Sequence, residues 1–87
     1  MTDWEFEYDG HARSSLQGFS VEQRVELDGI ARRLTERAAF MYPRDPEYGD
    51  PGVSDLLMHP EGTWVVSYQV HRPRRRVYIV QITGPSA

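Results

Sequence analysis

Two parts of the chain alternate between apolar and polar residues, and both predict β-strands. Residues 4–8 read Trp-Glu-Phe-Glu-Tyr, which is typical of a half-buried strand. Residues 64–71 and 77–83 are rich in β-branched and aromatic residues and are joined by a short segment containing Pro73, so they predict a β-hairpin. The side chains predicted to face the core are Trp4, Phe6 and Tyr8 on the first strand, Trp64, Val66, Tyr68 and Val70 on the first arm of the hairpin, and Tyr78, Val80 and Ile82 on its second arm.

The residues between these strands carry two helical patterns. Residues 11–17 predict a short helix with Ala12 and Leu16 on one face. Ser20 and Gln23 have the spacing of a capping box, which predicts the start of a longer helix that runs to about residue 39. Gly29 inside this helix is unfavourable and suggests a close crossing with a neighbouring element. The predicted inward stripe of the helix is Leu27, Ile30, Ala31, Leu34 and Ala38.

The central part of the chain predicts mostly irregular structure. Residues 41–52 hold three prolines and two glycines and predict a long loop. Residues 53–58 predict a short strand and residues 59–62 a turn. The element order strand-helix-helix-strand-strand-strand over residues 1–87 predicts a single α+β domain, with two helices packed on one face of a small, mainly antiparallel sheet. The other face is predicted to be open and mostly neutral, with Val65, Ser67, Gln69, Ile79, Gln81 and Thr83 on it.

Composition narrows the class of protein. The chain has 87 residues and no cysteine, so disulfides and thiolate-bound metals are excluded. Its acidic N-terminal residues do not resemble a signal peptide, and no apolar run approaches the roughly 18 residues of a membrane span. We therefore expect a cytoplasmic protein that uses no metal or cofactor and does not enter a membrane.

Charge is distributed unevenly along the chain. The formal net charge is −3, residues 45–62 hold five acidic residues and no arginine, and four arginines cluster within residues 72–76. Such a cluster fits the phosphates of a nucleic acid or an acidic partner protein, although a solvated hairpin tip explains it equally well. The candidate contact residues are Arg72, Arg74, Arg75 and Arg76, with Arg44 as a weaker one.

Other candidate chemistry is sparse. His59 and His71 are weak acid–base candidates because histidine titrates near neutral pH, but no fixed spacing pairs them with each other or with a nucleophile. The sequence contains no nucleophile elbow, P-loop or dinucleotide fingerprint. Tyr42 and Tyr48 lie in the proline-rich loop, where they can stack on a base or anchor a partner.

The order of elements and the hairpin segments Trp-Val-Val-Ser-Tyr-Gln-Val (64–70) and Val-Tyr-Ile-Val-Gln-Ile (77–82) resemble the RelE/ParE toxin superfamily. The resemblance spans roughly residues 4–84. It implies a toxin of a bacterial toxin–antitoxin pair that is neutralised by an antitoxin wrapping its surface. RelE-like members cut messenger RNA on the ribosome, whereas ParE-like members act on gyrase.

The sequence departs from the nuclease pattern of that family. Leu56 and Met58 stand where RelE-like nucleases carry a basic pair, Val65 stands in place of an arginine, and Pro85 and Ser86 replace another. The family's C-terminal aromatic segment has no counterpart. RNA cleavage needs a proton acceptor and cationic groups, which the predicted open face lacks, so a nuclease of the usual kind is not expected. Whether the chain is an enzyme at all stays open.

Three functions remain in view. The first is a toxin-like component that acts on translation, through the ribosome or messenger RNA, or on another nucleic-acid machine, and is held by an antitoxin. The second is a non-enzymatic module that binds another protein, for which an exposed sheet edge is suited. The third is direct nucleic-acid binding through the arginine-rich segment.

Overall fold

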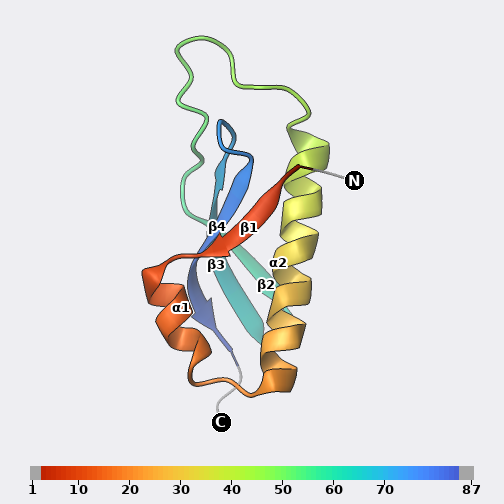
Figure 1. Ribbon diagram of the computed structural model, residues 1–87, viewed down its shortest axis with the longest axis vertical. Helices are drawn as coiled ribbons and strands as arrows, with labels where there is room; N and C mark the ends of the chain where they lie inside the picture. Colours follow the sequence, from red (N-terminus) through yellow and green to blue (C-terminus); the bar gives the residue numbers. More distant parts are fainter. Residues whose placement is uncertain (1–2, 85–87) are drawn as a thin grey trace.

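The computed structural model describes residues 3–84, which form two helices and a four-stranded sheet (Figure 1). The sheet has the order β1-β4-β3-β2. The pairs β2–β3 and β3–β4 are antiparallel, whereas β1 lies parallel to β4, so the predicted α+β fold and mainly antiparallel sheet are confirmed. In chain order the elements are β1 (Glu5–Tyr8), α1 (Gly10–Leu16), α2 (Val21–Met41), β2 (Leu57–Glu61), β3 (Trp64–His71) and β4 (Arg76–Thr83).

Helix α2 begins where the capping box predicts. The Ser20 hydroxyl oxygen accepts a hydrogen bond from the Gln23 backbone N–H at 3.1 Å, and the Gln23 side chain accepts one from the Ser20 N–H at 2.8 Å. The helix continues two residues beyond the predicted end. All five predicted inward residues are buried, namely Leu27, Ile30, Ala31, Leu34 and Ala38.

Both helices contribute to one core with the sheet. Ala12 of α1 is completely buried, and Trp64 at the start of β3 packs edge-to-face on Phe19, with ring centroids 5.1 Å apart. The close crossing expected at Gly29 is wrong, because a Cβ there would meet only the exposed Arg33 side chain, at 3.5 Å.

Strand β1 joins the N-terminus to this core. Trp4 is buried, and Phe6 and Tyr8 are partly buried beside it, as the alternation predicts. The Tyr8 hydroxyl donates a 2.5 Å hydrogen bond to Asp28 on α2. Burial, together with the neighbouring carboxylate, raises the pKa of Tyr8 well above its ordinary value, so the phenol stays protonated and holds β1 against the helix.

The side-chain phase of β4 differs from the prediction because of a β-bulge. Ser67 pairs with Gln81 but Tyr68 pairs with Ile79, so one extra residue, Val80, lies on β4 between these pairs. Consequently Val77 and Ile79 are fully buried and Tyr78 faces the open side. The predicted core positions of Tyr78 and Val80 and the predicted open position of Ile79 were therefore wrong, while those of Ile82, Gln81 and Thr83 are correct.

The position of β2 is a second correction. The strand predicted over residues 53–58 and the turn predicted over 59–62 are wrong, since β2 runs from Leu57 to Glu61 and contains Pro60. Proline is tolerated because β2 is an edge strand of the sheet. Val53 makes only an isolated bridge to His71, and the segment around it continues along the edge of β3 past the end of β2.

Candidate target-binding surface

The four clustered arginines lie in and beside the turn that joins β3 to β4. We call residues 72–76 the arginine turn. The Arg75 N–H donates to the Arg72 carbonyl at 3.1 Å and closes a tight turn with Pro73 inside it. Arg75 then adopts a positive φ of 51°, which is uncommon for a residue with a side chain. The four arginine side chains of this turn therefore point in different directions.

Arg72 turns back toward the long loop that follows α2. Its guanidinium lies 4.7 Å from the centre of the Tyr42 ring and 3.6 Å from a carboxylate oxygen of Asp50. It also donates to the Arg44 carbonyl at 3.4 Å. Its Nε atom is buried and is one of two buried side-chain nitrogens without a hydrogen-bond partner among the described residues. Arg72 is thus largely engaged within the molecule.

Arg75 bridges two distant segments. Its guanidinium pairs with Asp3, near the N-terminus, and with Asp45 of the loop at 3.4 Å. The hydrogen bond and charge of Asp3, with a smaller contribution from Asp45, raise the pKa of Arg75 above its ordinary value. Two carboxylates therefore share one cation at the tip of the hairpin.

Arg76 fastens the parallel pair of strands. Its Nη2 lies 3.3 Å from Glu5 and its Nε 3.5 Å from Glu7, both on β1. Val77, the next residue, is buried in the core, so Arg76 and its register partner Glu5 lie on the open face of the sheet.

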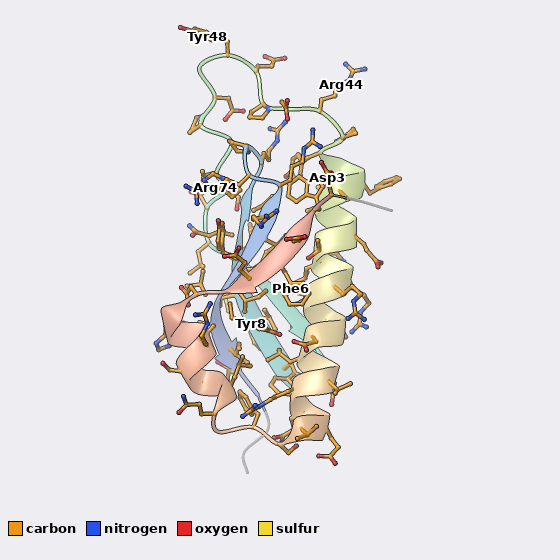
Figure 2. All side chains as sticks on the ribbon, viewed as in Figure 1. Asp3, Phe6, Tyr8, Arg44, Tyr48 and Arg74 are labelled. Atoms are coloured by element: carbon orange, nitrogen blue, oxygen red, sulfur yellow. The ribbon has the colours of Figure 1, made fainter. Side chains whose placement is uncertain are left out.

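Arg74 and Arg44 are more accessible. Figure 2 shows Arg44 near the end of α2 and Arg74 on the other side of the hairpin, so the two do not form one patch. Arg74 is exposed and reaches only the Tyr78 hydroxyl, at 3.5 Å. The predicted contact residues therefore comprise three arginines that carry internal carboxylate partners and two that point to solvent.

The open face has two chemically different halves. Near the start of β3 it is neutral, as predicted, with Val65 and Gln81, although Ser67 on the same face is buried rather than open to solvent. Near the arginine turn it is not. Two adjacent cross-strand rows bring together Glu5, Arg76 and His71, and then Glu7, Tyr78 and Gln69.

We call these six residues the polar rows. The His71 and Tyr78 rings meet edge-on, with centroids 6.0 Å apart, and the Nδ1 atom of His71 is buried without a partner. The expectation that the open face lacks both a proton acceptor and a cation is therefore wrong. Sequence reasoning missed Glu7 and Tyr78, because the bulge and the parallel pairing of β1 are not visible in the residue pattern.

His59 lies elsewhere. It stands opposite Val66 on β2, about 16 Å along the sheet from His71 at the usual rise of a strand. Its Nε2 lies 3.1 Å from Glu61, which also pairs with Arg33. The hydrogen bonds from His59 and Arg33 lower the pKa of Glu61. The two candidate histidines are thus not brought together.

The positions that depart from the family's nuclease pattern carry no charge here. Leu56 and Met58 are 53% and 68% exposed, and Val65 is partly buried on the open face. Pro85 and Ser86 lie outside the described residues. Cleavage chemistry at the usual positions therefore has no support between residues 3 and 84.

A mostly apolar groove lies between the C-terminal half of α2 and the strands β2 and β3. It has a volume of about 180 Å³, and Met41 and Leu57 on its two walls are exposed. Phe40 is exposed nearby on α2. The outer edge of β2 pairs with no other strand in the described part of the chain, so backbone groups are available beside this groove.

The described residues offer neither a cluster of metal ligands nor a membrane-spanning helix. Residues 3–84 contain no group of three or more histidine, aspartate or glutamate side chains placed to hold a metal ion. Neither helix in that range combines the length and the hydropathy of a membrane span.

Comparison with known proteins identifies the fold. No protein-family model matches the sequence, and no curated protein matches it either. Among solved structures, a double mutant of the Escherichia coli toxin RelE, in complex with a peptide of the antitoxin RelB, matches 99% of this chain and 87% of its own chain. The TM-score is 0.62 and the sequence identity is 14%. The resemblance noted in the sequence is therefore confirmed at the level of structure, and the chain has the RelE fold.

Proposed function

We propose that this chain is the toxin component of a bacterial toxin–antitoxin pair, which acts in the cytoplasm on translation and is neutralised by an antitoxin. The observation that carries the proposal is the match of nearly the whole chain to a RelE toxin bound to an antitoxin peptide. Fold alone does not fix function, so the assignment of a target depends on the surfaces of this chain.

The arginine turn and the polar rows support contact with RNA. Arg74 and Arg44 offer exposed guanidinium groups, and Arg76 lies between carboxylates and His71 on the open face. If the chain cleaves RNA, Glu7 would accept the 2′-hydroxyl proton, Arg76 would stabilise the phosphate, and His71 would protonate the leaving 5′ oxygen. His59 is too remote to take part.

The β2 edge and its groove support an antitoxin as partner. An extended segment can add to the free edge of β2 through backbone hydrogen bonds. Exposed apolar side chains beside that edge, including Leu57 and Met58, would be covered by the same segment.

Expression without a partner tests the proposal. We expect growth arrest on induction and, if RNA is cut, new 5′ ends in translated messenger RNA on primer extension. His71→Gln and Glu7→Gln should each reduce cleavage by about 10²–10⁴-fold, as expected for loss of an acid or a base. His11→Gln, which changes an exposed residue of α1, is the matched control and should leave cleavage unchanged.

The second candidate is a non-enzymatic protein-binding module on the same scaffold. It is favoured by one observation, the replacement of the family's charged nuclease positions by Leu56, Met58 and Val65. Normal growth despite confirmed soluble expression would favour this candidate. Growth arrest without new RNA ends, abolished by substitutions in the arginine turn, would favour a toxin that binds but does not cut.

A further inference from the structure

The loop between α2 and β2 packs directly on the arginine turn. We call residues 43–52 the acidic loop, because they hold Asp45, Glu47 and Asp50 against the single basic residue Arg44. Figure 1 shows this loop arching over the tip of the hairpin. The Arg72 N–H donates to the Gly52 carbonyl at 2.8 Å.

The backbone at Gly52 makes a close approach to the turn. Its φ is +71°, and a Cβ there would come within 2.8 Å of ring carbons of Pro46 and Pro73. The contact between the acidic loop and the arginine turn is therefore intimate and depends on glycine at this position.

The carboxylates of the loop occupy the arginines that the turn would offer to a target. Asp50 lies 3.6 Å from Arg72 and Asp45 lies 3.4 Å from Arg75. The two carboxylates are 49% and 74% exposed, so both ion pairs are screened by water and individually weak. A polyanion with many phosphates can compete for such arginines, because it also releases its own condensed counterions.

We propose that the acidic loop is an internal cover for a phosphate-binding site on the arginine turn, and that single-stranded RNA binds there by displacing Asp45 and Asp50. This inference rests on the proposed function, which assigns the turn to an RNA target. The cover makes the free chain a weak RNA binder and reserves the arginines for a target that presents several phosphates at once.

Aromatic rings beside the arginines favour RNA over an acidic peptide. The Tyr42 ring centre lies 4.7 Å from the Arg72 guanidinium, and the Tyr78 hydroxyl lies 3.5 Å from that of Arg74. Tyr48 is fully exposed at the outer tip of the loop (Figure 2). Single-stranded nucleic acid presents bases and phosphates in alternation, which suits interleaved tyrosines and arginines, whereas an acidic peptide gives the rings no partner.

Displacement of the loop would break no helix or strand. Gly49, near the tip of the loop, has a φ of +92°, and a Cβ built there would have no atom within 4 Å. Residues 43–52 contain no helix or strand. In the proposed displacement, the loop bends between Tyr42 and Gly52, so the hydrogen bonds of α2 and of the sheet are kept.

Anisotropy of a fluorescein-labelled single-stranded RNA tests the cover. The test variant combines Asp45→Asn with Asp50→Asn. Asparagine keeps the side-chain oxygen that accepts the Gly52 N–H at 2.8 Å, so the local turn survives. The control variant combines Glu26→Gln with Glu36→Gln, which removes two exposed carboxylates from α2 and changes the net charge equally.

We expect the test variant to bind RNA about tenfold more tightly than the control variant at the same salt concentration, because two competing ion pairs are gone. Adding Arg72→Gln to the test variant should remove this gain. Equal affinity of the two double variants would show that only net charge matters and would overturn the cover. An equal gain for a polyglutamate peptide would overturn the assignment to RNA.

Two checks keep the outcome clear. If the double variant unfolds, Asp45→Asn alone leaves the turn at Asp50 intact and should show part of the gain. Growth arrest combined with equal RNA affinities would refute the cover and leave the toxin proposal standing. A gain specific to the test variant, without growth arrest, would refute the toxin proposal and leave the cover standing.

Discussion

The two ends of the β3–β4 hairpin are held together by different forces. At its base, Trp64 and Val66 are almost completely buried against Phe19 and the rest of the core. At its tip, Arg72, Arg75 and Arg76 are held by exposed or partly exposed carboxylates. Burial of a large aromatic side chain contributes a few kcal/mol, whereas an exposed ion pair contributes about 0.2–1 kcal/mol.

This difference shows which end is free to change partners. The base cannot release its side chains without exposing the core to water. The tip can exchange one carboxylate for another anion at little cost, because both states keep each arginine paired. We therefore expect stability to depend on the base and recognition to depend on the tip, and substitutions at each end separate the two.

The largest effect is expected at the base. Trp64→Ala should lower the free energy of unfolding by about 3–5 kcal/mol, because it removes a buried ring and leaves a cavity against Phe19. Urea denaturation followed by circular dichroism measures this change. Trp4→Ala removes a second buried tryptophan and is the matched control for the loss of an indole. A loss below about 1 kcal/mol for Trp64→Ala would show that the hairpin base is not held by burial.

A smaller effect is expected at the tip. Arg76→Gln removes both ion pairs to β1 and should cost less than about 1 kcal/mol, since Glu5 and Glu7 remain solvated. The difference from the parent chain should shrink in 1 M salt, where the Debye length is about 3 Å. Urea denaturation at low and high salt measures it. A salt-independent loss as large as that of Trp64→Ala would mean that the two ends are equally structural.

The sequence predicts the base of the hairpin well. Along β3, large apolar residues alternate with smaller or polar ones, so Trp64, Tyr68 and Val70 are placed correctly on the core face. Helix α2 is also predicted closely, because the capping box and the inward stripe depend on neighbours within one or two turns. Local rules are sufficient where partners are close in sequence.

Which side chains of β4 face the core cannot be predicted in the same way. Residues 77–80 read Val-Tyr-Ile-Val, so every position is apolar and the pattern does not say which side faces the core. The bulge at Val80 then allows Ile79 and Ile82 to be buried together, although they are three positions apart and a regular strand would place them on opposite faces. The position of the extra residue, Val80, thus determines whether Tyr78 lies in the core or on the open face.

The carboxylate partners of the arginines at the hairpin tip are also not predictable from the sequence. Arg75 pairs with Asp3, 72 residues away, and with Asp45, 30 residues away. The only signal was the excess of acid in residues 45–62 facing an excess of arginine in 72–76, which suggests neutralisation without naming pairs. The polar rows were missed for the same reason, because they depend on parallel pairing between β1 and β4.

The smallest expected effect lies away from the hairpin tip, at the end of β2, and depends on pH. Hydrogen bonds from His59 and then Arg33 lower the pKa of Glu61, so the folded chain holds this carboxylate ionised more strongly than the unfolded chain does. The resulting stability is present above the ordinary glutamate pKa of about 4.3 and is lost as pH falls through the lower value of the folded state. The melting temperature of Glu61→Gln should therefore lie slightly below that of the parent chain from pH 7 to 5 and converge with it toward pH 3.

Glu47→Gln, in the exposed loop, is the control. Its melting temperature should not fall below that of the parent chain between pH 7 and 5. A difference for Glu61→Gln that stays constant down to pH 3 would mean that the ionised carboxylate does not stabilise β2.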